Sequence, residues 1–206
     1  MNEQLNVLIL NASLKHTGVP SNTEEVAMMV VTEMQKHATI THEIVRLSDK
    51  RIPVGLGFKE SEDDEWPSIV EKIKAADIIL FATPIWWGGR SSLMQRVIER
   101  MDAFDEEVIA GGRAVLLNKV AGIVITGSED GAQAVMAGMM EVLSFMNFTL
   151  PPQCCTYWVG EVGEDPKTDA DRRRANKAVA HMAANTAYNL VQTAALLKKN
   201  PLAALQ

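Results

Sequence analysis

The chain has little of what several common kinds of site require. Only two of its 206 residues are cysteines, Cys154 and Cys155, and these two are adjacent. Neighbouring side chains of a strand point to opposite faces, so a disulfide between them would be strained. The spacing also fits neither a zinc site nor an iron–sulfur site. We therefore interpret both cysteines as small apolar core residues and expect no metal ligands.

Long runs of charged or apolar residues are also missing. The formal net charge is −6, and no basic stretch is available to neutralise the phosphates of a nucleic acid. The arginine run 172–174 lies beside Asp169 and Asp171, and we interpret it as a solvated helix face. A segment of about 18 apolar residues and a signal-peptide pattern are both absent. We expect a soluble, cytoplasmic protein without a membrane span.

The composition is that of an ordinary globular protein, with 47% hydrophobic and 22% charged residues. Nothing in a chain of this length requires a second domain, so we expect one domain over residues 1–206. The nucleotide-binding fingerprints GxGxxG and GxxxxGK[ST] are absent, which disfavours dinucleotide and nucleoside triphosphate sites.

Short apolar runs alternate with segments of helical periodicity. Residues 7–10 and 78–82 are too short for a lone helix and are typical of parallel strands buried on both faces. Further strands are expected at 40–47 (nearer an edge), 119–125 and 148–158 (interrupted by Pro151 and Pro152), and helices at 22–37, 68–76, 91–104, 132–146 and 169–198. This alternation predicts an α/β fold: a three-layer sandwich with a five-stranded parallel sheet in the flavodoxin-like order 2-1-3-4-5.

The polar loop after the first strand can bind a phosphate. It leads into a helix whose first N–H groups are free and whose dipole favours an anion. A capping box, in which Ser21 caps the helix and Glu24 reaches back to it, explains part of the same pattern without a ligand. Both interpretations remain open on this stretch alone. The residues that would bind the phosphate are Ser13, Lys15, Ser21, Asn22 and Thr23.

Two more loops are expected at the same edge of the sheet, where the carboxyl ends of parallel strands bind ligands. The loop at 83–90 offers apolar and aromatic surface and a glycine pair, and the loop at 126–131 offers backbone N–H groups and hydroxyls. The same residues can be explained without a ligand, because tryptophans after a buried strand often pack against a helix or a second subunit and glycines often form simple turns. A phosphate site beside a site for a flat ring describes FMN. The residues that would border the ring are Pro84, Ile85, Trp86, Trp87, Gly88 and Gly89, and Thr126, Gly127, Ser128, Asp130 and Gly131.

Three segments together resemble the NAD(P)H-dependent FMN reductase family of flavodoxin-like proteins, over about residues 5–150. They are NASLKHTGVPSNTEEVA, ADIILFATPIWWGGRSSLMQRVIERMD and ITGSEDGA. The resemblance implies that the first segment holds the FMN phosphate and that the other two border the isoalloxazine. The first loop, which contains Thr17-Gly18-Val19-Pro20, departs from the shorter loops that the family leads us to expect at this place. The compact cysteine motif of the family's iron–sulfur members is absent, so no cluster is implied.

The leading hypothesis is an FMN-dependent oxidoreductase that takes hydride from NADH or NADPH. It would pass the electrons to a small acceptor such as a quinone, a flavin, an azo compound or a nitro compound. The cofactor supplies this chemistry, so no catalytic side chain is expected.

Two other functions remain open. The net charge and the acidic run 60–65, otherwise interpreted as a solvated loop, would suit a flavodoxin-type electron carrier that exchanges single electrons with a basic protein partner. A domain that binds a partner and no flavin is the third possibility. Apolar residues such as Met136, Met139 and Met140 and the apolar face of the last helix favour a homodimer or homotetramer.

Overall fold

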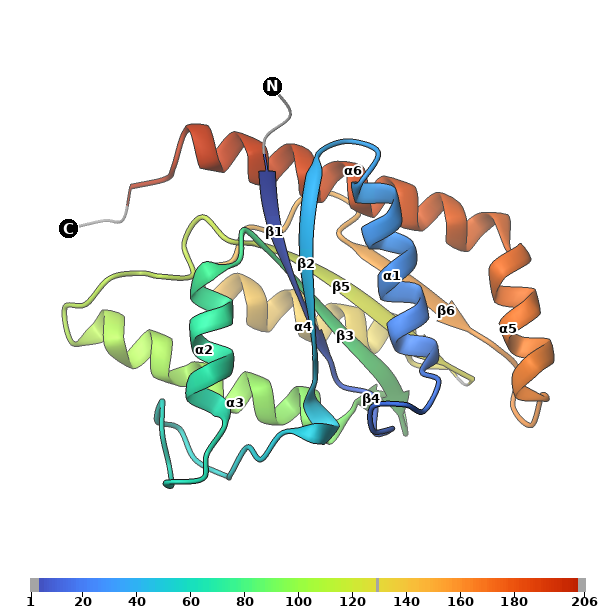
Figure 1. The fold of residues 1–206 in the computed structure, drawn as a ribbon, viewed down its shortest axis with the longest axis horizontal. Helices are drawn as coiled ribbons and strands as arrows, with labels where there is room; N and C mark the ends of the chain where they lie inside the picture. Colours follow the sequence, from blue (N-terminus) through green and yellow to red (C-terminus); the bar gives the residue numbers. More distant parts are fainter. Residues whose placement is uncertain (1–3, 129, 204–206) are drawn as a thin grey trace.

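The computed structural model describes residues 4–128 and 130–203, and a sheet of six strands forms the middle of that part (Figure 1). Five strands are parallel, in the order β2-β1-β3-β5-β6, and β4 pairs with β3 in the antiparallel direction. The parallel strands thus follow the predicted order 2-1-3-4-5, and the edge position of the second strand is confirmed. The strands are β1 (Gln4–Asn11), β2 (Thr39–Arg46), β3 (Ile78–Trp86), β4 (Gly89–Arg90), β5 (Val120–Gly127) and β6 (Cys155–Val159).

The sheet has one short antiparallel strand more than the five parallel strands that the sequence predicts. The segment expected to be only a loop reverses at Trp87 and Gly88, and Gly89 and Arg90 then pair with Trp86 and Ile85. Trp87 has φ +50° and Gly88 has φ +76°. Two successive residues with positive φ are the mark of the tight hairpin turn whose twist matches paired strands. A tryptophan rarely takes this conformation, so its sequence gives no hairpin signal.

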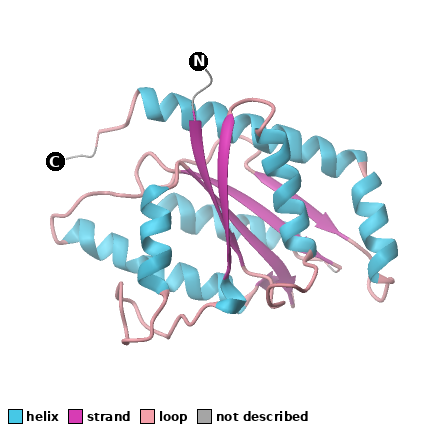
Figure 2. Ribbon diagram, viewed as in Figure 1, coloured by secondary structure: helices cyan, strands magenta, loops and turns pink. Residues whose placement is uncertain are grey.

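Helices cover both faces of the sheet (Figure 2), which confirms the three-layer sandwich. Helices α1 and α6 pack on one face, and α2, α3 and α4 pack on the other. No helix in the described ranges is long and apolar enough to cross a membrane. The helices are α1 (Asn22–Met34), the 3-10 turn η1 (Leu47–Asp49), α2 (Trp66–Ala75), α3 (Ser92–Ile109), α4 (Ala132–Phe145), α5 (Pro166–Ala175) and α6 (Lys177–Lys199).

The single helix expected over 169–198 is in fact two helices. Asn176 ends α5 and begins α6, with an extended ψ of 112°. Its side-chain oxygen accepts hydrogen bonds from the N–H groups of Ala178 and Val179, at 2.9 and 3.1 Å. Asparagine is a favoured N-cap because it satisfies these free donors. The break lets α5 turn towards the carboxyl edge of the sheet.

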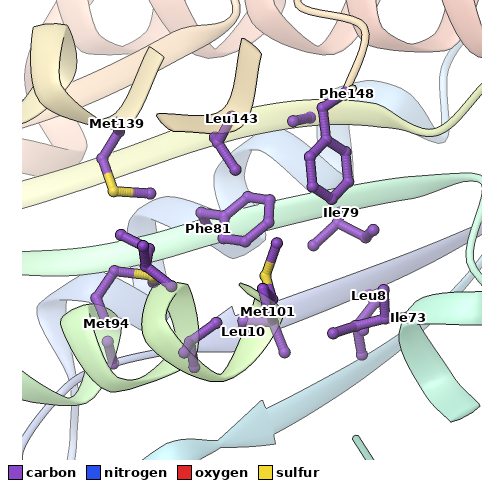
Figure 3. Packing of buried hydrophobic residues seen from close by; sticks show 14 of the residues in the cluster. Leu8, Leu10, Ile73, Ile79, Phe81, Met94, Met101, Met139, Leu143 and Phe148 are labelled. Atoms are coloured by element: carbon purple, nitrogen blue, oxygen red, sulfur yellow. The ribbon is translucent and has the colours of Figure 1, made fainter. Parts of the chain in front are cut away.

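Alternation along the central strands fills both cores. Leu8 and Leu10 of β1 face the core under α2, α3 and α4, and Val7 and Ile9 face the core under α1 and α6. Figure 3 shows the first of these cores, where Phe81 of β3 lies among leucine, isoleucine and methionine side chains. Met139, predicted to offer surface for a partner, is fully buried there. Residues 7–10 of β1 and 78–82 of β3 are therefore buried on both faces, as predicted.

The two cysteines are free thiols that pack on opposite faces of the sheet. Cys154 belongs to the α1 and α6 core, and Cys155 packs against the other core. Burial raises the pKa of the Cys155 thiol to about 12. Both residues fill core space, as predicted, and neither is a reactive thiolate at neutral pH.

The acidic run 60–65 is not simply a solvated loop, because Asp64 is buried against Arg100 of α3. The side chains of both residues are 0% exposed, and a guanidinium N–H group lies 2.7 Å from the carboxylate. Arg100 also donates to the carbonyl oxygens of Pro53 and Gly57. Burial alone would raise the pKa of Asp64, but hydrogen bonds from Arg100 and from backbone N–H groups outweigh it and hold the pKa below its usual range. The pair fixes the long connection between η1 and α2 on α3.

We expect Asp64→Asn to lower the free energy of unfolding at neutral pH by roughly 3 kcal/mol, because it leaves the Arg100 charge buried without a counter-ion. The pKa of Asp64 is lower in the folded protein than in the unfolded chain. The pair therefore stabilises the protein fully at a pH above the unfolded-state pKa. This stability is lost as the pH falls below about 4 and through the folded pKa. Urea unfolding across acidic pH should therefore show a flatter pH dependence in the variant. Glu62→Gln, at an exposed neighbour, is the control, and equal acid sensitivity of Asp64→Asn and the natural protein would contradict the account.

Candidate functional site

A cleft of about 450 Å³ opens at the carboxyl edge of the parallel strands. This size falls within the usual range of small-molecule sites, roughly 300–1,000 Å³. It is lined by the carboxyl ends of β3 and β5 and by the segments that follow β1, β3, β5 and β6. The three loops predicted from the sequence therefore meet in one place, and a fourth segment joins them.

Most of the predicted site residues line this cleft. Ser21, Gly88, Gly89, Asp130 and Gly131 do not line it, and Glu129 of the third loop lies outside the described residues. The predicted residues that do line it are Ser13, Lys15, Asn22 and Thr23 of the first loop, Pro84, Ile85, Trp86 and Trp87 of the second, and Thr126, Gly127 and Ser128 of the third.

Half of the predicted capping box forms at the start of α1. The Ser21 hydroxyl accepts a hydrogen bond from the Glu24 N–H at 3.2 Å, so Ser21 is the N-cap. Glu24 does not reach back, because its carboxylate accepts from Asn11 and Arg46 instead. The N–H groups of the first helical residues, Asn22 and Thr23, have no acceptor within the helix. Both residues line the cleft, so this end of the cleft can bind an anion.

The first loop is held in shape by Arg46, at the end of β2. One guanidinium nitrogen donates to the carbonyl oxygens of His16, Val19 and Lys15, at 2.6, 2.9 and 3.3 Å. The other terminal nitrogen binds Glu24 of α1. Five donors in a rigid fork let one buried arginine bind several oxygens at once. Sequence reasoning missed Arg46, because nothing in the chain order links it to this loop.

Asp49, in the turn after β2, holds the same loop from another side. Its carboxylate accepts hydrogen bonds from the hydroxyl and N–H of Thr17 and lies 2.9 Å from the Nδ1 of His16. The Thr17 hydroxyl and the His16 ring hold the pKa of Asp49 below its usual range. The long version of the loop is thus ordered by residues 46–49.

The second and third loops touch each other through two glycines. A Cβ atom at Gly131 would lie 2.9 Å from the Gly88 Cα, and Gly131 has φ +129°, a conformation that other residues rarely adopt. Gly88 and Gly131 therefore set the spacing of the two loops, although neither lines the cleft. Between the first and third loops, the hydroxyls of Thr23 and Thr126 lie 2.7 Å apart in a buried hydrogen bond.

The two tryptophans lie at the rim of the cleft. Trp87 is 95% exposed and Trp86 is 51% exposed, so neither is packed into the core of the described chain. Both also line the cleft. Their rings offer an apolar, flat surface beside the polar end at α1, which suits a ligand with a planar group and an anionic group.

The segment between β6 and α5 supplies the fourth wall, which the sequence analysis did not include. Glu161, Glu164 and Asp169 line the cleft, and Glu164 has one buried carboxylate oxygen without a hydrogen-bond partner among the described residues. A Cβ at Gly160 would lie 2.1 Å from a carboxylate oxygen of Asp169, so only glycine leaves room for this side chain. The rule that ligands bind beyond the carboxyl ends of strands, applied to the fifth parallel strand as well, would have found this wall.

Known proteins resemble the chain in sequence and in structure. It is 32% identical over 197 residues to the 8-demethyl-8-aminoriboflavin-5′-phosphate synthase of Streptomyces davaonensis, covering 89% of this chain and 76% of that protein. The crystal structure of RosB with bound 8-demethyl-8-formylriboflavin-5′-phosphate superposes with a TM-score of 0.82 at 28% identity, covering 96% of this chain and 82% of that one. The apo form of the NADH:FMN oxidoreductase EMOB has a TM-score of 0.68 at 15% identity, covering 92% and 89%, which shows the shared fold.

The family model described as NADPH-dependent FMN reductase matches residues 5–162. That range contains the three predicted loops, β1 without its first residue, β2 to β6 and the helices between them. The resemblance inferred from the sequence is thereby confirmed, and the chain belongs to the NADPH-dependent FMN reductase family.

Proposed function

We propose that the chain binds FMN in the cleft and acts as an oxidoreductase. It takes hydride from NADH or NADPH and passes the electrons to a small acceptor such as a quinone, a flavin, an azo compound or a nitro compound. The observation that carries this proposal is the single cleft with an anion-binding helix terminus at one end and an aromatic rim at the other. Membership of the FMN reductase family supports it.

The donors at the α1 end fit a phosphate monoester. Ser13, Asn22 and Thr23 line the cleft, and the N–H groups of Asn22 and Thr23 have no acceptor within the helix. The ammonium group of Lys15 donates to the Pro20 carbonyl oxygen at 3.1 Å and has two further protons for a phosphate. Backbone N–H groups and a lysine are a common set of phosphate ligands.

The second and third loops fit the ring of the flavin. The contact of Gly88 with Gly131 fixes the spacing of these loops, and Trp86 and Trp87 offer flat surface at the rim. Thr126 and Ser128 add hydroxyls at the same edge. The protein would bind and orient FMN, and the flavin ring would accept the hydride from the nicotinamide and pass the electrons on. None of this requires a general acid or base from the protein.

A second candidate treats the flavin as a substrate rather than a resident cofactor. The curated relative is named as a synthase of a flavin phosphate that carries an amino group at C8, and the RosB crystal structure holds an 8-formyl flavin phosphate. In this case the same cleft would bind FMN and expose its C8 methyl group for modification.

One experiment separates the two candidates. The protein is loaded with FMN, NADH or NADPH is added without oxygen, and the visible absorbance is recorded; a second sample is incubated in air with an amino donor, and its flavin is recovered and weighed by mass spectrometry. We expect the flavin absorbance to bleach and the mass to stay unchanged. A changed mass would favour the synthase, and a flavin spectrum left unchanged by both nicotinamides would contradict the oxidoreductase. A stable one-electron semiquinone in a separate redox titration would favour an electron carrier. A protein that binds no FMN would contradict both proposals.

We expect Gly131→Ala to weaken FMN binding roughly tenfold or more, a loss of about 1.4 kcal/mol of binding free energy. The new methyl group meets the Gly88 Cα and must push the second and third loops apart. Gly111→Ala is the matched control, because Gly111 also has positive φ, +84°, but its added Cβ meets nothing within 4 Å. Fluorescence titration with FMN measures the dissociation constants of both variants. Equal affinity of the two variants would show that the glycine contact does not shape the site.

A further inference from the structure

The arginines of α5 neutralise the carboxylates around the α1 end of the cleft. Arg172 lies 2.9 Å from Glu161 and 2.8 Å from Glu164, both of which line the cleft. Arg174 binds Glu25, in the first turn of α1. The interpretation of this run as a solvated helix face was wrong for Arg173, whose side chain is 0% exposed.

Arg173 is the member of the run that reaches the start of α1. Its guanidinium donates to Asp169 at 2.5 Å, to Glu25 at 2.6 Å and to the side-chain oxygen of Asn22 at 3.3 Å. Its Nε is buried without a hydrogen-bond partner in the described part of the chain. Burying a charged side chain is costly unless it is paired with opposite charges. The hydrogen bonds of Arg173 to Asp169, Glu25 and Asn22 therefore hold α5 against α1.

Asn22 is bound from both ends of its side-chain amide. The NH₂ group donates to Asp169 at 3.3 Å, and the oxygen accepts from Arg173. Asp169 is fixed in turn by the indole N–H of Trp158, at 2.8 Å. Asn22, with its side chain held in this way, lines the cleft, and its backbone N–H is the first of α1 and has no acceptor within the helix.

The charges of this network also decide which ligand can enter. A phosphate monoester brings about 1.5 to 2 negative charges to a place with Glu25 and Asp169 close by. Burial alone would raise the pKa of Glu25, but hydrogen bonds from Arg174 and Arg173 outweigh it and hold the pKa below its usual value. Glu25 therefore stays ionised, and without Arg173 the two carboxylates would repel the phosphate.

We propose that Arg173 is a positioning residue that makes the cleft select a phosphorylated flavin over riboflavin. It holds Asn22 at the first turn of α1, and it neutralises Glu25 and Asp169. The inference rests on the proposed binding of FMN. Arg173 lies beyond residue 162, where the family match ends, so the family match does not assign this role.

The test compares the dissociation constants of FMN and riboflavin, measured by fluorescence titration, in four proteins: the natural chain, Arg173→Met, Arg173→Lys and Arg174→Met. We expect Arg173→Met to raise the FMN constant at least about tenfold, equivalent to about 1.4 kcal/mol, and to change the riboflavin constant little. Arg173→Lys keeps the charge without the planar fork and should give a smaller loss. Arg174→Met removes an arginine from the same helix that contacts Glu25 but not Asn22, and should keep most of the preference for FMN.

The outcomes are distinguishable. If the natural chain binds neither flavin, the proposed function fails. If it binds FMN but Arg173→Met weakens both ligands equally, Arg173 is only structural and the inference is overturned. If Arg173→Met does not fold, an unchanged FMN preference in folded Arg173→Lys overturns the inference, and a reduced preference supports it.

Discussion

The parallel hydrogen bonding of β1, β3 and β5 is the constraint on which the site depends. Asn11 is paired with Ala82, Ala82 with Val124, and Pro84 with Thr126, so three loops leave the sheet at nearly the same level. Neighbouring strands lie about 4.8 Å apart, which puts the loops within reach of one small ligand. Because both faces of these strands are buried, a slip of one residue would exchange the two cores, and the register is strongly fixed.

Buried arginines then fix the segments that the sheet does not hold. Arg46 binds three carbonyl oxygens of the first loop, Arg100 binds the connection before α2, and Arg173 joins α5 to α1. Each places one guanidinium among oxygen atoms of segments that are distant in sequence. Such pairs add little net stability compared with apolar packing, but the loss of one partner leaves a buried charge unpaired. We infer that Arg46 and Arg173 determine the shape of the cleft more than the stability of the fold.

The sequence predicts the parts that depend on local patterns. Apolar runs such as Ile78–Phe81 and the helix start at Ser21 follow from periodicity and capping, and the rule on strand ends brings the three loops together. The hairpin at Trp87 could not be predicted, because it requires a conformation that tryptophan rarely adopts. The roles of Arg46 and Arg173 were not predicted, because Val19 and Asn22, which they bind, lie far from them in the chain. For Arg173, the neighbouring charges of the run 172–174 suggested a solvated helix face instead.

The most direct test of the account is a crystal structure of the protein with FMN bound. The account predicts phosphate oxygens within hydrogen-bonding distance of the N–H groups of Asn22 and Thr23, with the ring between residues 84–87 and 126–128. A phosphate bound elsewhere, with the start of α1 left without a ligand while the ring occupies another surface, would contradict it.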